Sequence, residues 1–375
     1  MNEVLLTVSG VIPDDIEEQI ARGERPEADY IAMAREFGAD LVDYDLARRR
    51  NGRFGRLLEK IGGPNLLLAW DCFKRRDQYR LIFTDGEQVG LPLALLLKFA
   101  GRRPIHFMIG HILSVDKKMR LIDAFQLYNE IDTFFVYSTW QKEFIQSRWG
   151  VAPQRVIFTP FMVDAEFFRP DQAHEESAVL PELQGSESPI ICAVGLEFRD
   201  YPTLMEAVEN LDLHVVIAAA SPWSKRSDST SGQTIPANVT VSRFSQYELR
   251  DVYNRSAFMV MPLYENDFQA GVTALLEAMA MEKAIICSET AGQKDVIINN
   301  ETGLYIPPGD PSALRREIVA LLDQPGEAKR MGQNGRLRIE QEMSLELYVK
   351  RLNAYVQQAL ANLNYNQQFV EVSLE

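Results

Sequence analysis

The chain has 375 residues, which is more than one ordinary hydrophobic core holds and fits two domains of average size. Hydrophobic residues make up 46% of the sequence and charged residues 25%, a composition typical of globular rather than disordered proteins. The net charge of −14 argues against a general nucleic-acid-binding protein, because phosphate backbones attract a positive surface. Residues 1–170 are nearly neutral and the remainder carries most of the negative charge, which indicates that the two halves have different roles.

Three cysteines, Cys72, Cys192 and Cys287, lie far apart and lack CxxC spacing. This pattern excludes a disulfide framework and a zinc ribbon, and it fits a reducing compartment. No basic region precedes Val4–Val8, so the start of the chain is typical of a first strand rather than of a signal peptide. The most apolar run, Leu91–Ala100, is too short to span a bilayer. We therefore expect a cytoplasmic protein with, at most, peripheral contact to a membrane.

Short apolar runs alternate with amphipathic stretches through the first half of the chain. The predicted strands are Val4–Val8, Leu41–Tyr44, Tyr79–Thr84, Pro104–Ile109, Thr133–Ser138 and Val156–Thr159. The predicted helices between them include Leu91–Ala100, Met119–Glu130 and Trp140–Trp149. Strands that alternate with helices favour a parallel sheet covered on both faces.

The second half repeats this alternation after a polar stretch at residues 171–189, which we interpret as the domain boundary; residues 224–233 are predicted to form a loop. Its predicted strands are Ile190–Val194, His214–Ala219, Val239–Ser242, Phe258–Pro262, Ala284–Ser288 and Leu304–Pro307. The last predicted helices are Ser312–Leu322, Glu327–Gln341 and Leu345–Leu363. The pattern predicts an α/β fold of two facing, doubly wound Rossmann-like domains, residues 1–170 and 189–345. Residues 346–375 are expected to pack back toward the N-terminal domain, and ligands are expected at the carboxyl ends of the strands, in a cleft between the domains.

The most informative stretch is 258–281, which predicts a strand, a polar loop and then a helix from about Gly271 that is apolar on nearly every face. Free backbone amides at the start of this helix favour an anion such as a phosphate. Glu277 interrupts the apolar run, and a buried carboxylate needs hydrogen-bond donors, which the two hydroxyls of a ribose would supply. The same carboxylate also fits a structural role, as the cap of a loop or the partner of a core arginine.

This segment resembles the donor-binding region of glycosyltransferase family 4, the retaining enzymes of the GT-B fold that are also called glycosyl transferases group 1. The resemblance covers about Ile190 to Leu322. Leu276-Glu277-Ala278-Met279-Ala280 matches the second half of the family's E-x(7)-E pattern. Gly292-Gln293-Lys294-Asp295-Val296-Ile297 stands where the family has Gly-x-Pro-Glu-x-Ile, and a Thr-Gly-Leu turn follows at 302–304. Upstream, Ala193-Val194-Gly195 and Arg199-Asp200-Tyr201-Pro202 resemble the first strand, loop and helix of that domain.

The resemblance implies a role for each matching residue. Glu277 would bind the ribose hydroxyls of a nucleotide sugar, and Arg199 would pair with the diphosphate and offset the charge that develops on the leaving group. The further donor-binding residues would be Gly195, Arg243, Phe244, Gln269, Ala270, Gly271 and Val272. Among these, the amides at 270–272 would hold sugar and phosphate, and Arg243 and Phe244 would lie beside the base.

The sequence departs from the family pattern at two positions. Gln269 replaces the first glutamate of E-x(7)-E, so an amide would contact the sugar hydroxyls and the charge of that carboxylate is lost. The family usually has an arginine beside Gly195, whereas Leu196 and Glu197 follow it here. Arg199 is then the clear cation of this loop, with Lys225 or Arg226 as a compensating charge.

Three residues of the first half have candidate roles. His111 follows a predicted strand, and the resemblance implies that it contacts the donor sugar; as an isolated histidine it equally fits a structural role. Together with Arg199 and Gln269 it completes the predicted catalytic set. Gly10 and Glu87 are weaker candidates for acceptor binding, and the alternative for Asp85–Gln88 is a turn that opens the next helix.

The basic residues between Arg48 and Lys60 surround apolar ones, which fits contact with an anionic membrane surface or a solvated helix face. No His/Cys cluster has metal-ligand spacing, and we discount the short Asp43-Tyr44-Asp45 pattern as a metal site.

The sequence thus predicts a retaining, metal-independent glycosyltransferase that needs no cofactor beyond its substrate. The donor would be a nucleotide-diphosphate sugar and the acceptor a glycan, a lipid or a small molecule. Two alternatives stay open: a nucleotide-sugar epimerase, and a non-catalytic protein that binds nucleotide sugars, which Gln269 favours.

Overall fold

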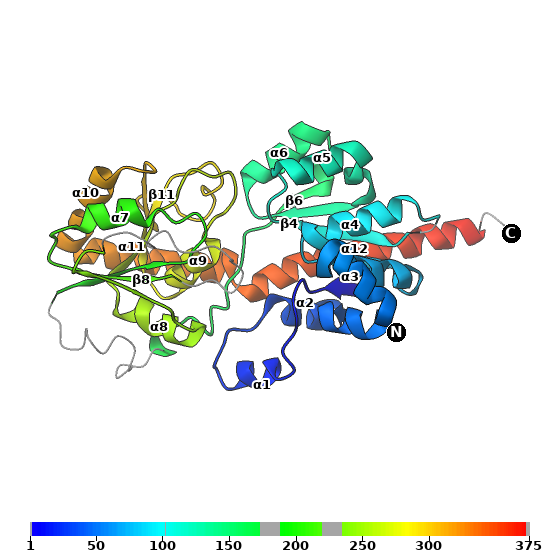
Figure 1. Ribbon diagram of the computed structural model, residues 1–375, viewed down its shortest axis with the longest axis horizontal. Helices are drawn as coiled ribbons and strands as arrows, with labels where there is room; N and C mark the ends of the chain where they lie inside the picture. The colour runs from blue at the N-terminus through cyan, green and yellow to red at the C-terminus, as the bar shows by residue number, and fades with distance from the viewer. Residues whose placement is uncertain (1, 102, 173–187, 220–234, 373–375) are drawn as a thin grey trace. The chain divides into compact units, whose positions relative to one another are not determined.

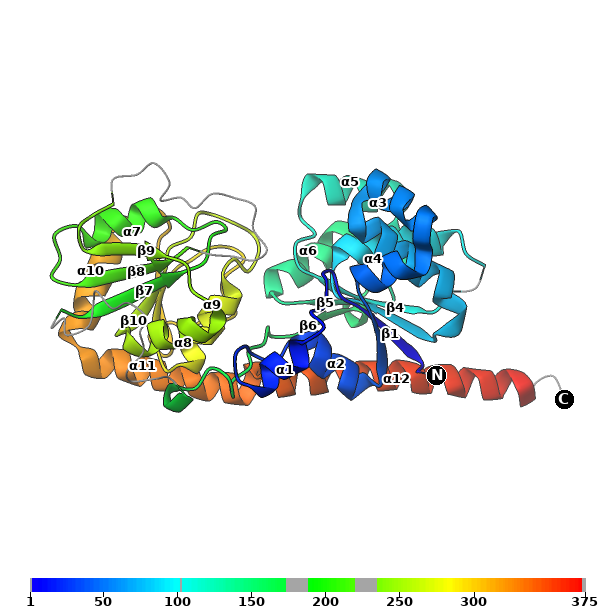
Figure 2. The same cartoon turned by 60° about the horizontal axis from the view of Figure 1, so that its bottom comes forward.

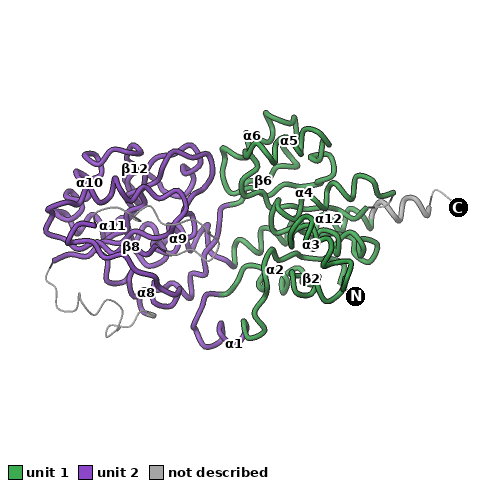
Figure 3. The backbone as a smooth tube through the Cα atoms, in the orientation of Figure 1, with its two compact units in different colours: residues 1–16, 27–159, 346–375 green, residues 17–26, 160–345 purple. Residues whose placement is uncertain are grey.

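The computed structural model describes residues 2–101, 103–172, 188–219 and 235–372 (Figure 1). The chain divides into two compact units (Figure 3). Unit 1 comprises residues 1–16, 27–159 and 346–375, and unit 2 comprises residues 17–26 and 160–345. Most of the polar stretch at 171–189, all of the expected loop at 224–233, and Lys225 and Arg226 within it lie outside the described residues.

Unit 1 is built on a six-stranded parallel sheet in the order β2-β1-β3-β4-β5-β6. Its strands are β1 (Val4–Thr7), β2 (Ala39–Val42), β3 (Leu81–Thr84), β4 (Ile105–Gly110), β5 (Thr133–Val136) and β6 (Val156–Phe158). Its helices include α2 (Asp29–Phe37), α3 (Tyr44–Arg75), α4 (Glu87–Lys98), α5 (Asp116–Phe125) and α6 (Thr139–Trp149). The strand order reverses between β1 and β3, which is where doubly wound sheets bind ligands.

The sequence analysis did not predict α3, whose helical backbone is interrupted twice, and identified only the basic stretch within it. Asp43 begins the helix by accepting a 2.7 Å hydrogen bond from the amide of Leu46. Gly52 and Gly63 then interrupt the helical backbone, with φ values of 50° and 76°. Because these glycines and Pro64 break the apolar periodicity, the pattern does not indicate one helix.

The C-terminal helix α12 (Leu345–Val372) contributes to the core of unit 1, although it lies farthest from the strands in sequence (Figure 2). Tyr348 is fully buried, and its hydroxyl lies 2.9 Å from the hydroxyl of Tyr137 at the end of β5. Farther along, the carbonyl of Leu360 accepts a 3.2 Å hydrogen bond from Arg80, just before β3.

Unit 2 contains a second six-stranded parallel sheet, in the order β12-β11-β10-β7-β8-β9. Its strands are β7 (Ile190–Val194), β8 (His214–Ala218), β9 (Val239–Ser242), β10 (Phe258–Met261), β11 (Ala284–Ser288) and β12 (Gly303–Ile306). Its helices are α7 (Tyr201–Val208), α8 (Gln246–Arg255), α9 (Val272–Ala280), α10 (Pro311–Asp323) and α11 (Pro325–Arg338), and α1 (Ile16–Ala21) begins at the end of the first segment of unit 1. Every predicted strand is present in the two sheets, with ends that differ by at most two residues.

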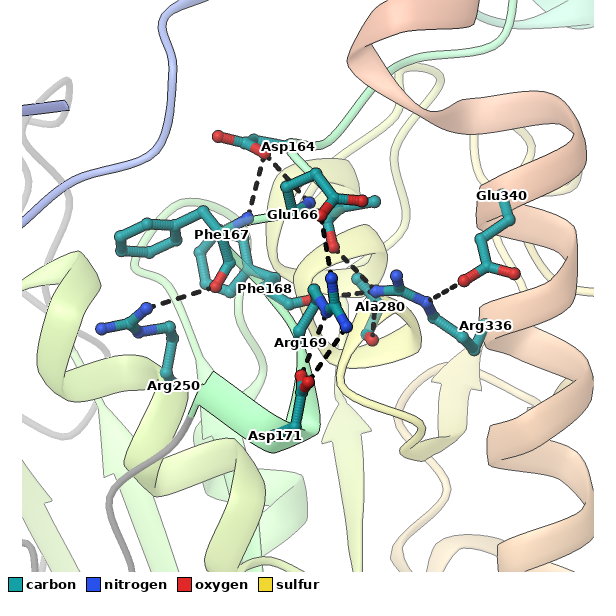
Figure 4. A network of polar contacts seen from close by, with 11 residues as sticks. Asp164, Glu166, Phe167, Phe168, Arg169, Asp171, Arg250, Ala280, Arg336 and Glu340 are labelled. Atoms are coloured by element: carbon teal, nitrogen blue, oxygen red, sulfur yellow. Dashed lines mark hydrogen bonds and ion pairs between the residues drawn. The ribbon is translucent and has the colours of Figure 1, made fainter. Parts of the chain in front are cut away.

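The segment that enters unit 2 is fixed beside the segment that leaves it. Val163 forms a parallel bridge with Ser344, and the amide of Leu345 donates a 2.9 Å hydrogen bond to the carbonyl of Val163. Arg336 of α11 donates from Nη1 to the carbonyls of three residues, as Figure 4 shows. The three acceptors are Ala165 at 2.9 Å, Phe168 at 2.8 Å and Ala280 at 3.0 Å. Arg336 therefore joins the entering segment to the end of α9.

Candidate functional site

The loops that follow β7 and β10 meet at the point where the strand order of unit 2 reverses. The amide of Asp200 donates to the carbonyl of Pro262 at 3.0 Å, and the amide of Tyr264 donates to the carbonyl of Phe198 at 3.0 Å. Arg199 forms an antiparallel bridge with Leu263 between these two bonds. The predicted residues of both loops are therefore held in one place, at the position where parallel sheets bind ligands.

Arg199 lies at the centre of this meeting point and is only 5% exposed. Its Nε donates to the carbonyl of Val194 at 2.9 Å and its Nη1 to the carbonyl of Glu197 at 2.6 Å. Its Nη2 lies against two glycines: a Cβ would be 2.2 Å away on Gly195 and 2.9 Å away on Gly271. Both glycines also have positive φ values, 108° and 77°. Burial lowers the pKa of Arg199, although an arginine stays charged in proteins.

The first turn of α9 begins beside this guanidinium. Gly271 precedes the helix, and no side chain caps it. Among the described residues, the amide of Gly271 has no hydrogen-bond acceptor. The amides of Ala270 and Val272, which were also predicted to hold the ligand, instead donate to the carbonyls of Phe268 at 2.8 Å and Gln269 at 3.4 Å. The amide of Gly271 lies at the positive end of the helix dipole, so it and Arg199 form a site suited to an anion.

Glu277 lies two turns into α9 and is 5% exposed. The described structure gives its carboxylate one hydrogen bond, 2.8 Å long, from the hydroxyl of Tyr253 on α8. Burial raises the pKa of Glu277 to about 7, and the bond from Tyr253 acts in the opposite direction. Neither structural alternative, a loop cap or an arginine partner, is among the described contacts. The sequence analysis missed Tyr253, because no motif marks it within the polar pattern of α8.

Gln269 and Ala270 connect the anion site to the loop after β11. Gln269 is half-buried, and its Oε1 is buried without a hydrogen-bond partner in the part of the chain that the structure describes. The carbonyl of Ala270 accepts a 2.9 Å hydrogen bond from Nε2 of Gln293, which is fully buried. Gln293 was not predicted as a site residue, although its position in the Gly-x-Pro-Glu-like segment was a signal. Val272, the first residue of α9, has a buried side chain.

Arg243 and Phe244 follow β9, on the other side of β7 from β10. Arg243 is exposed, and Phe244 packs partly against the core of unit 2. No contact between these two residues and Arg199 or Glu277 is described. The structure thus places them at the same sheet edge without joining them to the anion site.

In unit 1, Glu87 begins α4 and is 2% exposed. It accepts hydrogen bonds from the amide of His111 at 2.8 Å, from the amide of Ile112 at 3.2 Å and from Nζ of Lys118 at 2.6 Å. Burial by itself would raise the pKa of Glu87, but the nearby charges of His111 and Lys118 lower it. Both carboxylate oxygens therefore hold the loop that presents His111. The ring of His111 is exposed, and its Nε2 lies 2.9 Å from the carbonyl of Asp85.

The loop after β1 is fixed by Asp85, which follows β3. Its carboxylate accepts from the hydroxyl of Thr7 at 2.5 Å, from the amide of Ser9 at 2.5 Å and from the hydroxyl of Ser9 at 2.9 Å. The carbonyl of Gly10 accepts from the amide of Tyr44 at 3.0 Å. A Cβ on Gly10 would meet no atom within 4 Å, so no protein contact requires a glycine there.

The basic stretch between Arg48 and Lys60 lies on α3 and has two kinds of cation. Arg48 is committed to ion pairs with Asp45 at 2.6 Å and Glu59 at 2.7 Å. The exposed cations are Arg49, Arg50, Arg53, Arg56 and Lys60, of which Arg50 pairs with Asp71 at 3.3 Å. The apolar side chains beside them are Phe54, Leu57 and Ile61, which are 50%, 53% and 71% exposed. Across the described ranges, no helix is long and apolar enough to cross a membrane. Within the same ranges, no group of three or more His, Cys, Asp or Glu side chains is placed to hold a metal ion.

The comparisons with known proteins agree with this organisation. Residues 188–338 match the family model of glycosyl transferases group 1. D-rhamnosyltransferase WbpZ of Pseudomonas aeruginosa is 29% identical over 146 residues, which are 38% of each chain. The alignments with the first curated relatives span at most half of those relatives' own length.

Two solved structures are similar over almost the whole chain. Sucrose-phosphate synthase from Thermosynechococcus elongatus has a TM-score of 0.70 at 18% identity, over 96% of this chain and 100% of that one. Anabaena Alr3699/HepE, in complex with UDP and glucose, has a TM-score of 0.69 at 12% identity, over the same shares of the two chains. These findings confirm the predicted resemblance to group 1 glycosyltransferases and the predicted α/β GT-B fold class.

Proposed function

We propose that this chain, whose residues 188–338 match the group 1 glycosyltransferase model, transfers a sugar from a nucleoside-diphosphate donor to an acceptor hydroxyl, with retention of configuration. The observation that carries the proposal is the constellation of Arg199, the uncapped start of α9 and the buried Glu277. A guanidinium and free amides suit a diphosphate, and a buried carboxylate with one protein donor suits a ribose diol. The solved complex of HepE with UDP and glucose supports a nucleotide ligand on this fold.

The residues of the proposed site act on different groups during the transfer. As the bond between the sugar and the phosphate breaks, negative charge grows on the leaving diphosphate, and Arg199 and the amide of Gly271 stabilise it. A phosphate oxygen of the leaving group takes the proton of the incoming acceptor hydroxyl, so no side-chain base is assigned. Gln269 accepts a hydrogen bond from a sugar hydroxyl through its unpartnered Oε1. The family resemblance further assigns contact with the donor sugar to His111 and acceptor binding to Gly10.

The donor is tested by thermal stabilisation with UDP-, GDP-, ADP- and dTDP-sugars beside the free nucleotides. A ligand that binds only the folded protein raises its melting temperature. We expect a shift with one nucleotide series, and the ranking of sugars within that series then selects the acceptor assays. The absence of any shift at about 1 mM ligand would overturn the proposed donor site, since a Kd of 10 µM gives about 2.7 kcal/mol at that concentration.

A non-catalytic role is the second candidate, because Gln269 replaces a carboxylate of the family pattern. The two functions differ in one measurement. A transferase releases free nucleoside diphosphate faster when glycan, lipid or sugar acceptors are added. A binding protein shows the thermal shift with no release, and an epimerase converts the sugar without an acceptor.

The exposed cations and apolar side chains of α3 support peripheral contact with an anionic membrane, which fits a lipid acceptor. The test is sedimentation with vesicles of phosphatidylglycerol and phosphatidylcholine. Arg53→Glu with Arg56→Glu should abolish binding, whereas Lys117→Glu with Arg120→Glu, exposed on α5, should retain it. Equal binding of the two double variants would overturn the assignment to α3.

A further inference from the structure

The loop after β11 lies directly against the loop that leads into α9. A Cβ on Gly292 would meet the backbone of Phe268 at 2.2–2.4 Å, so no side chain fits between the two loops. The amide of Gly292 donates to the carbonyl of Asn266 at 3.3 Å. This contact places the next residue, Gln293, beneath the residues that precede α9.

Gln293 is 0% exposed and directs one half of its side-chain amide at that loop. Its Nε2 donates a 2.9 Å hydrogen bond to the carbonyl of Ala270, and its Oε1 is buried without a partner among the described residues. A primary amide costs free energy to bury unless its polar atoms are satisfied. An apolar residue would fill the same volume at a lower cost in free energy of folding. The hydrogen bond to Ala270 therefore indicates a role for Gln293 other than packing.

The hydrogen bond to the carbonyl of Ala270 also sets the direction of the next N–H in the chain, that of Gly271. In a trans peptide the carbonyl and the following N–H point in opposite directions. Because the carbonyl of Ala270 points at the buried Gln293, the N–H of Gly271 points away from it. That N–H has no acceptor among the described residues, Gly271 is only half-buried, and Nη2 of Arg199 lies beside its Cα. The peptide between Ala270 and Gly271 is therefore locked with its donor available to an anion.

We propose that Gln293 is a positioning residue of the donor site: by holding the carbonyl of Ala270, it aims the amide of Gly271 at a phosphate of the nucleotide. This inference rests on the proposed function and adds to it a residue that touches no substrate. Since Gln293 acts through the amide of Gly271, its substitution should weaken binding of the phosphates of the ligand and leave binding of the nucleoside unchanged.

The test compares phosphate and nucleoside ligands across matched variants. Gln293→Met keeps the length of the side chain and removes the donor, and Gln293→Leu removes the donor with a second apolar side chain. Thr290→Val is the control, because Thr290 lies in the same turn, is 1% exposed, and its hydroxyl has no partner among the described residues. Calorimetry or competition measures UDP, GDP and ADP against uridine, guanosine and adenosine, and the melting temperature of each ligand-free variant is recorded.

We expect both Gln293 variants to bind the cognate diphosphate about tenfold more weakly, which is the loss of one hydrogen bond to a charged group. Binding of the nucleoside should change less than twofold, and Thr290→Val should resemble the wild type for both. Equal losses for diphosphate and nucleoside would overturn the proposal, since they indicate a general distortion of unit 2. Unchanged diphosphate binding in Gln293→Met would also overturn it. If the wild type binds none of these diphosphates and no dTDP either, the proposed function fails instead.

Discussion

The hydroxyl of Tyr253 donates a 2.8 Å hydrogen bond to Oε2 of Glu277, and both side chains are buried between α8 and α9. One neutral donor is a small compensation for a buried carboxylate, which explains why burial raises the pKa of Glu277 to about 7. A carboxylate in this state gains most from further donors that arrive with a ligand. The pair therefore connects the stability of unit 2 to the occupancy of the proposed donor site.

The first prediction concerns pH. Glu277 keeps its proton in the folded state up to about pH 7, whereas the unfolded chain loses it near the ordinary value of a glutamic acid. The folded state thus binds more protons in this range, and Glu277 lowers the free energy of unfolding as pH rises from about 4.5 to 7. Glu277→Gln should remove about 3 kcal/mol of this dependence, as measured by urea unfolding at pH 5 and pH 8. Parallel pH profiles for wild type and variant would contradict the assignment.

The affinity for the ligand should rise with pH through the ionisation of Glu277, whereas the free energy of unfolding falls. The ionised carboxylate is the better acceptor for a ribose diol. Affinity for the cognate nucleotide sugar, whose diphosphate does not titrate in this range, should therefore fall as pH decreases from 8 to 6 in the wild type. In Glu277→Gln it should be weak and nearly independent of pH over this range, which calorimetry at matched ionic strength would check.

Arg199 should matter more for turnover than for folding. Arg199→Met removes the buried charge and the donors at the leaving group, so kcat should fall by about 10²–10³. Arg199→Lys keeps a charge without the planar guanidinium and should recover only part of that loss. Removal of the buried charge raises stability, whereas loss of the donors to the carbonyls of Val194 and Glu197 lowers it, so the melting temperature of the methionine variant should change little. Turnover of Arg199→Met within twofold of the wild type would show that the guanidinium does not act at the reacting centre.

Alanine substitutions at two glycines with similar φ values distinguish the effect of backbone strain from the effect of a side chain at the proposed site. Gly271 and Gly150 have φ values of 77° and 64°, so alanine at either position costs about 1 kcal/mol of stability. A Cβ on Gly271 would lie 2.9 Å from Nη2 of Arg199 and 2.8 Å from Sδ of Met261, whereas a Cβ on Gly150 meets nothing within 4 Å. Gly271→Ala should therefore weaken nucleotide binding at least tenfold, and Gly150→Ala should leave it unchanged. Similar affinities of the two variants would mean that Arg199 and Gly271 do not share one ligand.

Arg336 should stabilise unit 2 through the segment shown in Figure 4. Arg336→Met leaves the carbonyls of Ala165, Phe168 and Ala280 without this donor, and the free energy of unfolding should fall by about 2–4 kcal/mol. The matched control is Arg169→Met, because Arg169 is exposed and pairs with Glu166 and Asp171 on the surface. That variant should lose less than about 1 kcal/mol in the same denaturant titration. Equal losses would show that the three carbonyls find other partners.

Local sequence patterns predicted most of the strands and helices but few of the contacts at the site. The buried runs of Val and Ile marked all twelve strands, because a parallel sheet covered on both faces needs continuous apolar segments. The apolar helix with Glu277 at its centre was equally clear. Helix α3 was missed because Gly52 and Gly63 interrupt its pattern, and α8 was missed because its sequence is mostly polar.

Patterns along the chain were enough to predict the fold class, the resemblance to group 1 glycosyltransferases and the residue types available for an anion and a diol. Only the tertiary structure placed Arg199 between Gly195 and Gly271, Tyr253 on Glu277, and Gln293 beneath Ala270. The reason is physical: strand and helix formation depend on neighbours along the chain, whereas these contacts join residues up to 72 positions apart. They form because parallel strands end at one edge of a sheet, and that edge collects loops that the sequence keeps separate.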